Sequence, residues 1–177
     1  MFISPIINLN SGKNFFNNDV TLADKTLTIK VGESVENHGL LIGRERVDIK
    51  AQNEINLYSD SGLQGRNVFL EATNINIQGD VVPDLSAESN FFEARYAESG
   101  ECIMPAVLTA FNNLNIIADQ LVVRYADIPK PSEQINLQVK NIVVESCTER
   151  TSWLIAYFKD TNNGIQSADK TTEIEAA

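Results

Sequence analysis

The chain has few of the residues that form disulfide bonds and metal centres. It contains two cysteines and one histidine in 177 residues. Cys102 and Cys147 are too few for a disulfide framework and lack the CxxC spacing of a zinc site. His38 stands among turn-forming residues in the segment ENHG, which favours a surface turn over a nucleophilic triad. No phosphate-binding loop, HExxH or EF-hand pattern occurs, so no cofactor and no metal is predicted.

Positive charge and long apolar runs are also scarce. The 14 basic and 24 acidic residues give a formal net charge of −10, which disfavours nucleic acid as a partner. The first residues include no basic residue before the apolar ones and contain Pro5, so we expect neither a secretory signal nor membrane insertion. The composition, 43% hydrophobic and 21% charged, is typical of one globular domain.

What the chain does have is an internal repeat. Residues 47–57 (VDIKAQNEINL) recur at 68–77 (VFLEATNINI), and LTIKV at 27–31 begins 20 residues before the first of these. The segment LNIIADQLVV at 114–123 recurs 21 residues later as INLQVKNIVV at 135–144. Each unit holds two short alternating strands, too few to bury their own apolar face, so the units are expected to stack.

The repeat predicts an all-β fold, a right-handed parallel β-helix of seven or eight coils with 20 to 21 residues per coil. Adjacent coils would lie about 4.8 Å apart. One interior column would contain Leu27, Val47 and Val68, and on the outside Lys50 would lie over Glu71.

Two parts of the chain break the period. The β-helix is expected to occupy residues 1–159 as a single domain, with an irregular insertion over 83–112. Pro105 is expected to open a short helix over 106–111. The segment SWLIAYF at 152–158 predicts a strand, and residues 160–177 are expected to be a polar tail or an edge cover.

The stretch VENHGLLIGRERVDIKAQNEINL at 35–57 combines an Asn-x-Gly turn, an apolar-Gly step and a V-x-I-x-A strand. In this it resembles the repeats of filamentous-haemagglutinin-type exoproteins, chiefly over residues 27–80. The resemblance implies a right-handed β-helix, secretion by a two-partner route, an extracellular or cell-surface location, and adhesion to host surfaces or glycans.

Asp60 and Asp80 are the candidate catalytic pair. They follow Leu57 and Ile77 by three residues each, so a regular stack would bring their carboxylates to about 5 Å from each other. That separation suits an acid/base pair or a shared cation in polysaccharide chemistry. The alternative is that both are turn residues, because Asp is favoured in turns for its local hydrogen bonds.

Two further sets of residues are candidates for ligand binding. Positive charge gathers on the early coils, where Arg46 and Arg66 are expected to stack, and could bind an acidic glycan; the alternative is a solvated corner. This set comprises Arg44, Arg46, Lys50 and Arg66. The aromatic residues of the insertion could form a platform for sugar rings or a protein, or fill a core; they are Phe91, Phe92, Tyr96 and Phe111.

The favoured function is therefore a non-enzymatic, adhesin-like binding module. It would recognise a glycan or protein surface through an exposed β-face and the insertion at 83–112. One alternative is a carbohydrate-active enzyme, a polysaccharide lyase or hydrolase, that uses Asp60 and Asp80. Another is a small acidic inhibitor or assembly subunit. End-to-end association of copies is a further prediction, since open solenoid ends invite it.

Overall fold

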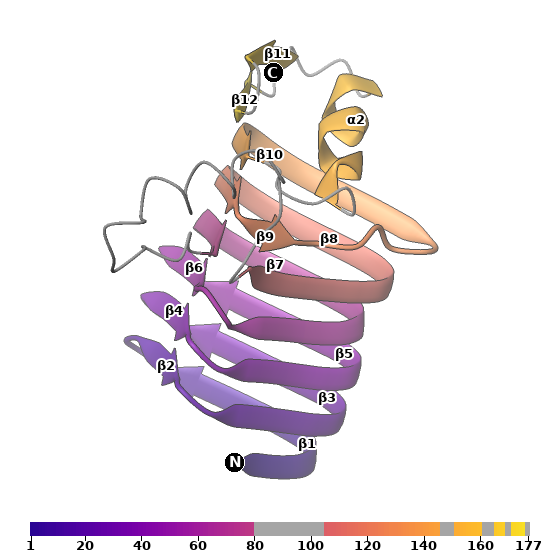
Figure 1. Ribbon diagram of the computed structural model, residues 1–177. Coiled ribbons are helices and arrows are strands. Elements are labelled where there is room, and N and C mark those ends of the chain that lie inside the picture. Colours follow the sequence, from indigo (N-terminus) through magenta and orange to yellow (C-terminus); the bar gives the residue numbers. More distant parts are fainter. Residues whose placement is uncertain (80–104, 146–150, 161–164, 169–170, 176–177) are drawn as a thin grey trace, which may run out of the picture.

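The protein is a parallel β-solenoid of about six turns (Figure 1). The computed structural model describes residues 1–79, 105–145, 151–160, 165–168 and 171–175. The fold class predicted from the repeat is confirmed, but the expected seven or eight coils are too many. The reason is that the residues after the sixth coil form a helix and a hairpin instead of further turns.

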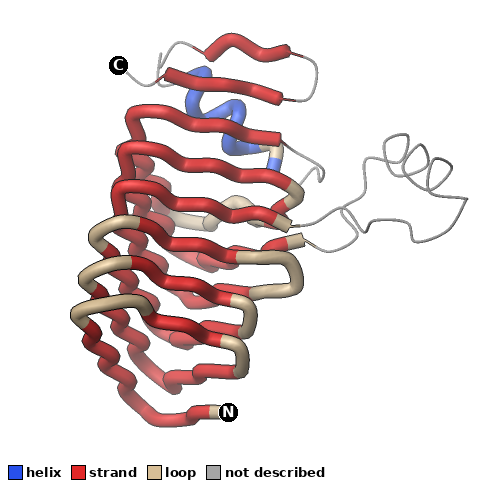
Figure 2. Tube along the Cα trace, turned by 90° about the vertical axis from the view of Figure 1, so that its left-hand side faces the viewer, coloured by secondary structure: helices blue, strands red, loops and turns tan. Residues whose placement is uncertain are grey.

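Each coil has three straight segments, which we call sides A, B and C. In the third coil they are residues 40–43, 46–51 and 54–57. The six coils cover residues 2–17, 20–37, 40–57, 62–78, 106–124 and 126–145. The strands are β1 (Phe2–Ser11), β2 (Phe15–Asn17), β3 (Val20–Val31), β4 (Ser34–Asn37), β5 (Leu40–Ala51), β6 (Glu54–Leu57), β7 (Gly62–Gln78), β8 (Ala106–Arg124), β9 (Ala126–Asp127) and β10 (Gln134–Glu145). Figure 2 shows these strands stacked from the N-terminal to the C-terminal end.

The predicted columns are confirmed. Val47 pairs with Leu27 in the coil before and with Val68 in the coil after, and Lys50 pairs with Glu71. The three interior side chains of this column are fully buried. Because every second residue of a strand points inward, each coil presents an apolar inner surface. Each buried Leu, Ile or Val contributes about 1.5–3 kcal/mol, but only when the neighbouring coil covers it.

Corners absorb the difference between the offsets of 20 and 21 residues. Between sides A and B, coil 3 has both Arg44 and Glu45, whereas coil 4 has only Arg66. Arg46 therefore pairs with Asn67, and the expected stacking of Arg46 over Arg66 is wrong.

Buried amides hold the corner between sides C and A. Asn37 is fully buried, and its Oδ1 accepts a hydrogen bond from Asn17 Nδ2 at 2.8 Å. Asn37 Nδ2 in turn donates to the carbonyl of Gly62 at 3.2 Å. A side chain at Gly39 would collide with the carbonyl of Asp19, since its Cβ would lie 2.1 Å from that oxygen. The Asn-x-Gly turn of the repeat therefore satisfies buried backbone groups where two coils approach closely.

The predicted strand over 152–158 is wrong, because these residues belong mainly to helix α2 (Trp153–Asp160). Leu154 and Phe158, four residues apart, are both buried, which is the spacing of one helix face. A seven-residue apolar run does not distinguish a helix from a strand by itself. Trp153 Nε1 donates to the carbonyl of Ile128 at 2.7 Å and so ties the helix to the last coil.

The chain beyond α2 returns to the sheet. Strand β12 (Thr171–Glu175) pairs antiparallel with β10, and β11 (Ile165–Ala168) pairs antiparallel with β12. The helix predicted over 106–111 is also wrong, because these residues begin β8 and pair with β7. The coil thus resumes at Ala106, inside the range expected to be irregular, while residues 83–104 lie outside the described residues.

We predict that Asn37→Ala lowers the free energy of unfolding by about 2 kcal/mol, because it removes two hydrogen bonds of a buried amide, one from Asn17 Nδ2 and one to the carbonyl of Gly62. Urea denaturation followed by circular dichroism measures this change. The control is Asn136→Ala, which removes an exposed amide and should change the unfolding free energy by less than about 0.5 kcal/mol. Equal stabilities of the two variants would contradict the role given to the buried amides.

Candidate functional site

Two of the predicted cations already have acidic partners. Arg44 Nη1 lies 3.6 Å from Asp24 Oδ1, and Arg46 Nη2 lies 2.9 Å from Asp48 Oδ2. The guanidinium group of Arg46 also lies over the ring of Phe69, with Cζ 4.1 Å from the ring centroid. These contacts occupy the two arginines within side B and its corner, so they leave little net positive charge for an acidic glycan.

The predicted Asp60 and Asp80 pair stays a prediction. Asp60 lies exposed in the turn between side C of coil 3 and side A of coil 4, with a φ of 57°. Asp80 lies outside the described residues, and so do Phe91, Phe92 and Tyr96.

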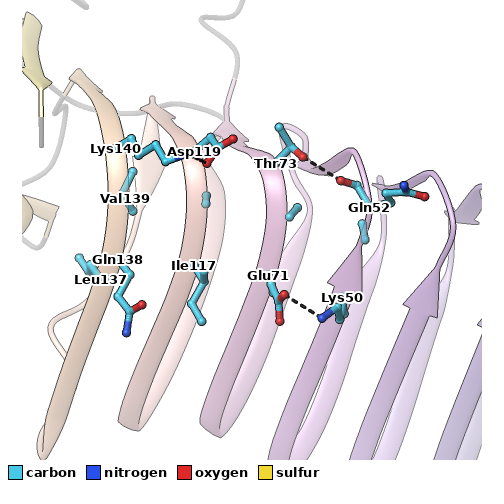
Figure 3. A pocket seen from close by; sticks show the side chains of 13 residues that line it. Lys50, Gln52, Glu71, Thr73, Ile117, Asp119, Leu137, Gln138, Val139 and Lys140 are labelled. Atoms are coloured by element: carbon cyan, nitrogen blue, oxygen red, sulfur yellow. Dashed lines mark hydrogen bonds and ion pairs between the residues drawn. The ribbon is translucent and has the colours of Figure 1, made fainter. Parts of the chain in front are cut away.

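A long furrow follows the corner between sides B and C. Across coils 3 to 6 it forms an open hollow of about 800 Å³ (Figure 3). One rim consists of outward residues of side B, and the other consists of corner residues two positions later. The side B rim is Lys50, Glu71, Ile117 and Gln138, and the corner rim is Gln52, Thr73, Asp119 and Lys140.

The furrow exists because the residues between the two rims are small. Ala51, Ala72, Ala118 and Val139 take these positions in the four coils. Ala72 pairs with Ala118, and Ala118 pairs with Val139, so buried apolar residues continue along the floor from coil to coil. Long side chains on either side then stand above that floor. Ile117 is 40% exposed and gives the side B rim an apolar patch.

The rims carry charges of both signs, and these neutralise one another. Lys50 Nζ lies 2.8 Å from Glu71 Oε1 along one rim, as Figure 3 shows. Along the other rim, Lys140 Nζ lies 2.7 Å from Asp119 Oδ1. Both pairs join adjacent coils. A ligand in the furrow therefore meets polar groups without a strong net charge.

The furrow continues toward the N-terminal end. A second hollow of about 450 Å³ follows the same corner in coils 1 to 3 and shares Lys50 with the first. Its floor includes Ser11 and Val31, which pair with each other in the same column. With a spacing of about 4.8 Å between coils, the combined furrow is about 24 Å long.

The backbone of the furrow is not available to a ligand. Side B of each coil pairs in parallel with side B of the next, from residues 46–50 through 67–72 and 113–118 to 134–139. The N–H and C=O groups of these strands therefore bond along the stack. Recognition in the furrow depends on side chains and on the apolar floor.

Side C carries a polar cluster that the repeat did not reveal. Tyr58 Oη donates to Glu36 Oε2 at 2.5 Å, and Asn56 Nδ2 donates to Glu36 Oε1 at 2.9 Å. The ring of His38 stacks on Tyr58 with the centroids 4.1 Å apart. Burial and the neighbouring Glu36 carboxylate raise the pKa of Tyr58 to about 12. The repeat contained a signal for this cluster, because Glu36 and Asn56 are 20 residues apart and so are His38 and Tyr58. The backbone register continues through Tyr58, whose N–H donates to the carbonyl of Asn37.

Comparison of the chain with family models, curated proteins and solved structures finds no match. Within the described ranges, no group of three or more His, Cys, Asp or Glu side chains is placed to hold a metal ion. No helix in that part of the chain is long and apolar enough to cross a membrane. The fold thus defines the class, a parallel β-solenoid, and the resemblance to haemagglutinin-type repeats stays a prediction.

We predict that one phenol of the protein titrates near pH 12 and that Glu36→Gln lowers its pKa while leaving it above 10, because burial is the larger cause of the shift. A tyrosine whose folded pKa is raised stabilises the fold fully below pH 10, and this contribution is lost as the pH rises toward 12. Absorbance titration at alkaline pH, with Tyr58→Phe to identify the group, measures the shift. A Tyr58 phenol that titrates near pH 10 would contradict the described contact.

Proposed function

We propose that this β-solenoid is a non-enzymatic binding module that holds an extended, uncharged glycan in the furrow between sides B and C. The observation that supports this most is the continuity of the furrow over successive coils, with a floor of buried apolar residues and, in coils 3 to 6, rims whose lysines are paired with carboxylates. A repeating surface of this kind suits a repeating polymer, because each coil adds a similar weak contact.

The charges favour an uncharged ligand. The chain has a net charge of −10, so an anionic polymer would be repelled at long range. The Lys50 and Lys140 ammonium groups are already paired with carboxylates, and using them for an anion would break those pairs. A hydroxyl-rich ligand can instead add hydrogen bonds to paired ammonium and carboxylate groups without displacing either.

The shape of the floor favours sugar rings over an extended peptide. Sugar rings have C–H faces that pack on exposed apolar side chains such as Ile117, while their hydroxyls can reach the polar side chains of the rims. A peptide would need partners for its own backbone groups, and the strands under the furrow have none to offer. Pairing with Gln52 or Gln138 alone would leave most peptide N–H and C=O groups unsatisfied.

The two alternative functions have less structural support. The enzyme alternative needs Asp60, which stands at the corner between sides C and A and does not line the furrow. The carboxylates that do line it, Glu71 and Asp119, are both engaged with lysines. The acidic-partner alternative depends on net charge alone.

The decisive test compares two double variants on the same strands. Ile117 pairs with Gln138 on the rim, and Asn115 pairs with Asn136 two residues earlier on the same outward surface but outside the furrow. We expect the protein to be retarded in native gels that contain neutral polysaccharides such as xylan or galactomannan. Ile117→Ala with Gln138→Ala should weaken this retardation about tenfold or more, which is about 1.4 kcal/mol.

The matched control is Asn115→Ala with Asn136→Ala, which removes two outward side chains without touching the furrow and should bind as the parent does. Circular dichroism checks that both variants keep the fold. Equal weakening in the two variants would place binding elsewhere on side B. Retardation by anionic gels alone, or by no gel, would refute the proposed function.

A further inference from the structure

Another hollow lies at the corner between side C of coil 3 and side A of coil 4, away from the furrow. The corner is longer here than in the coils before it. In the preceding corner, Asn37 and Leu40 are three residues apart. Their partners in the next coil, Leu57 and Gly62, are five residues apart. The two extra residues form a tight turn in which the Ser61 N–H donates to the carbonyl of Tyr58 at 3.1 Å.

A missing side chain opens the hollow. Gly62 pairs with Leu40 on one side and with Val107 on the other, so it interrupts an apolar column on the outside of side A. The gap is part of a hollow of about 310 Å³ whose apolar walls include Leu40, Ile42 and Val107. A Cβ at Gly62 would lie 2.8 Å from Leu40 Cδ2, which shows that the leucine side chain leans over the glycine.

A buried hydroxyl lies beside the hollow. Ser61 is 2% exposed and is one of the residues that line the hollow, and its Oγ, which is covered in the structure, makes no hydrogen bond to any described residue. Buried polar atoms in native proteins nearly always have a partner, so an exception calls for an explanation. Beside it, the exposed Asp60 also lines the hollow and adds a carboxylate near the mouth.

Together these groups indicate which chemical groups a ligand of the hollow would need. The Ser61 hydroxyl can donate to a carbonyl, and the Asp60 carboxylate can accept from an amide N–H. The walls around them suit a small apolar group such as a methyl. An acetamido group has all three parts in one unit. The volume is near the lower limit of small-ligand pockets, which fits a single sugar residue.

We propose that this corner pocket is a binding site for an N-acetylated amino sugar, with Asp60 and, after a rotation of its side chain toward the hollow, Ser61 as the polar contacts. The site is separate from the furrow and does not depend on it. A free amino sugar would offer an ammonium group to Asp60 but no acceptor to Ser61 and no methyl to the walls. A plain hexose would lack the amide altogether. Comparing the free amino sugar and the hexose with the N-acetylated sugar therefore tests whether the acetamido group is recognised.

The test titrates the isotope-labelled protein with N-acetylglucosamine, glucosamine and glucose and follows the backbone amide resonances. We expect saturable shifts with N-acetylglucosamine at Ser61, Gly62 and Val107, and at least tenfold weaker effects with the other two sugars. Ser61→Ala should weaken the binding about tenfold while leaving the melting temperature unchanged or higher, because the hydroxyl it removes has no partner.

Ser132→Ala is the matched control, since it removes an exposed serine hydroxyl elsewhere on the solenoid and should not change the binding. The furrow variant Ile117→Ala with Gln138→Ala should also leave these shifts intact. Three outcomes would overturn the proposal: equal or stronger shifts with glucose or glucosamine, unchanged affinity of Ser61→Ala, or no shift with N-acetylglucosamine at tens of millimolar.

Discussion

The structure depends on the register between neighbouring coils. A coil has no closed core of its own, and the inward side chain of Val47 is buried only because Leu27 and Val68 lie directly above and below it. Parallel backbone pairing fixes this alignment, and a slip by one residue would turn every apolar side chain of a side outward. The cost of such a slip grows with each coil added to the stack, which makes one register far more stable than its alternatives.

Because the sides must match in register, differences in length are confined to the corners, and the two proposed sites are corner features. The furrow arises where small residues such as Ala72 and Ala118 stand between longer ones, and the same position in each coil extends it. The pocket arises where coil 4 has two extra residues before Gly62. A corner can change without disturbing the columns on either side, whereas a change within a side disturbs every coil it touches.

The same division explains how much the sequence could predict. The repeat at Val47 and Val68 predicted the fold and the columns, since periodicity depends on the sides alone. Most failures lie outside the sides: Arg46 did not stack on Arg66 because a corner is one residue shorter in coil 4. The exception is the helix predicted over 106–111, which is side A of coil 5. Residues 152–158 became a helix because a short apolar run carries no decisive period. The furrow was missed because Glu71 and Ile117 are neighbours in the stack although 46 positions separate them in the chain.

The ion pair at Lys50 connects the stability of the stack to the choice of ligand. Lys50 pairs in register with Lys30 on one side and Glu71 on the other, so one neighbour repels it and the other attracts it. Two lysines on adjacent strands repel each other and destabilise the stack. The contact of Lys50 with Glu71 Oε1 at 2.8 Å offsets this repulsion. The contact also removes a free positive charge from the rim of the furrow. A charge arrangement that the register favours therefore balances the charges of the furrow in coils 3 to 6, and a furrow without net charge is suited to a hydroxyl-rich polymer.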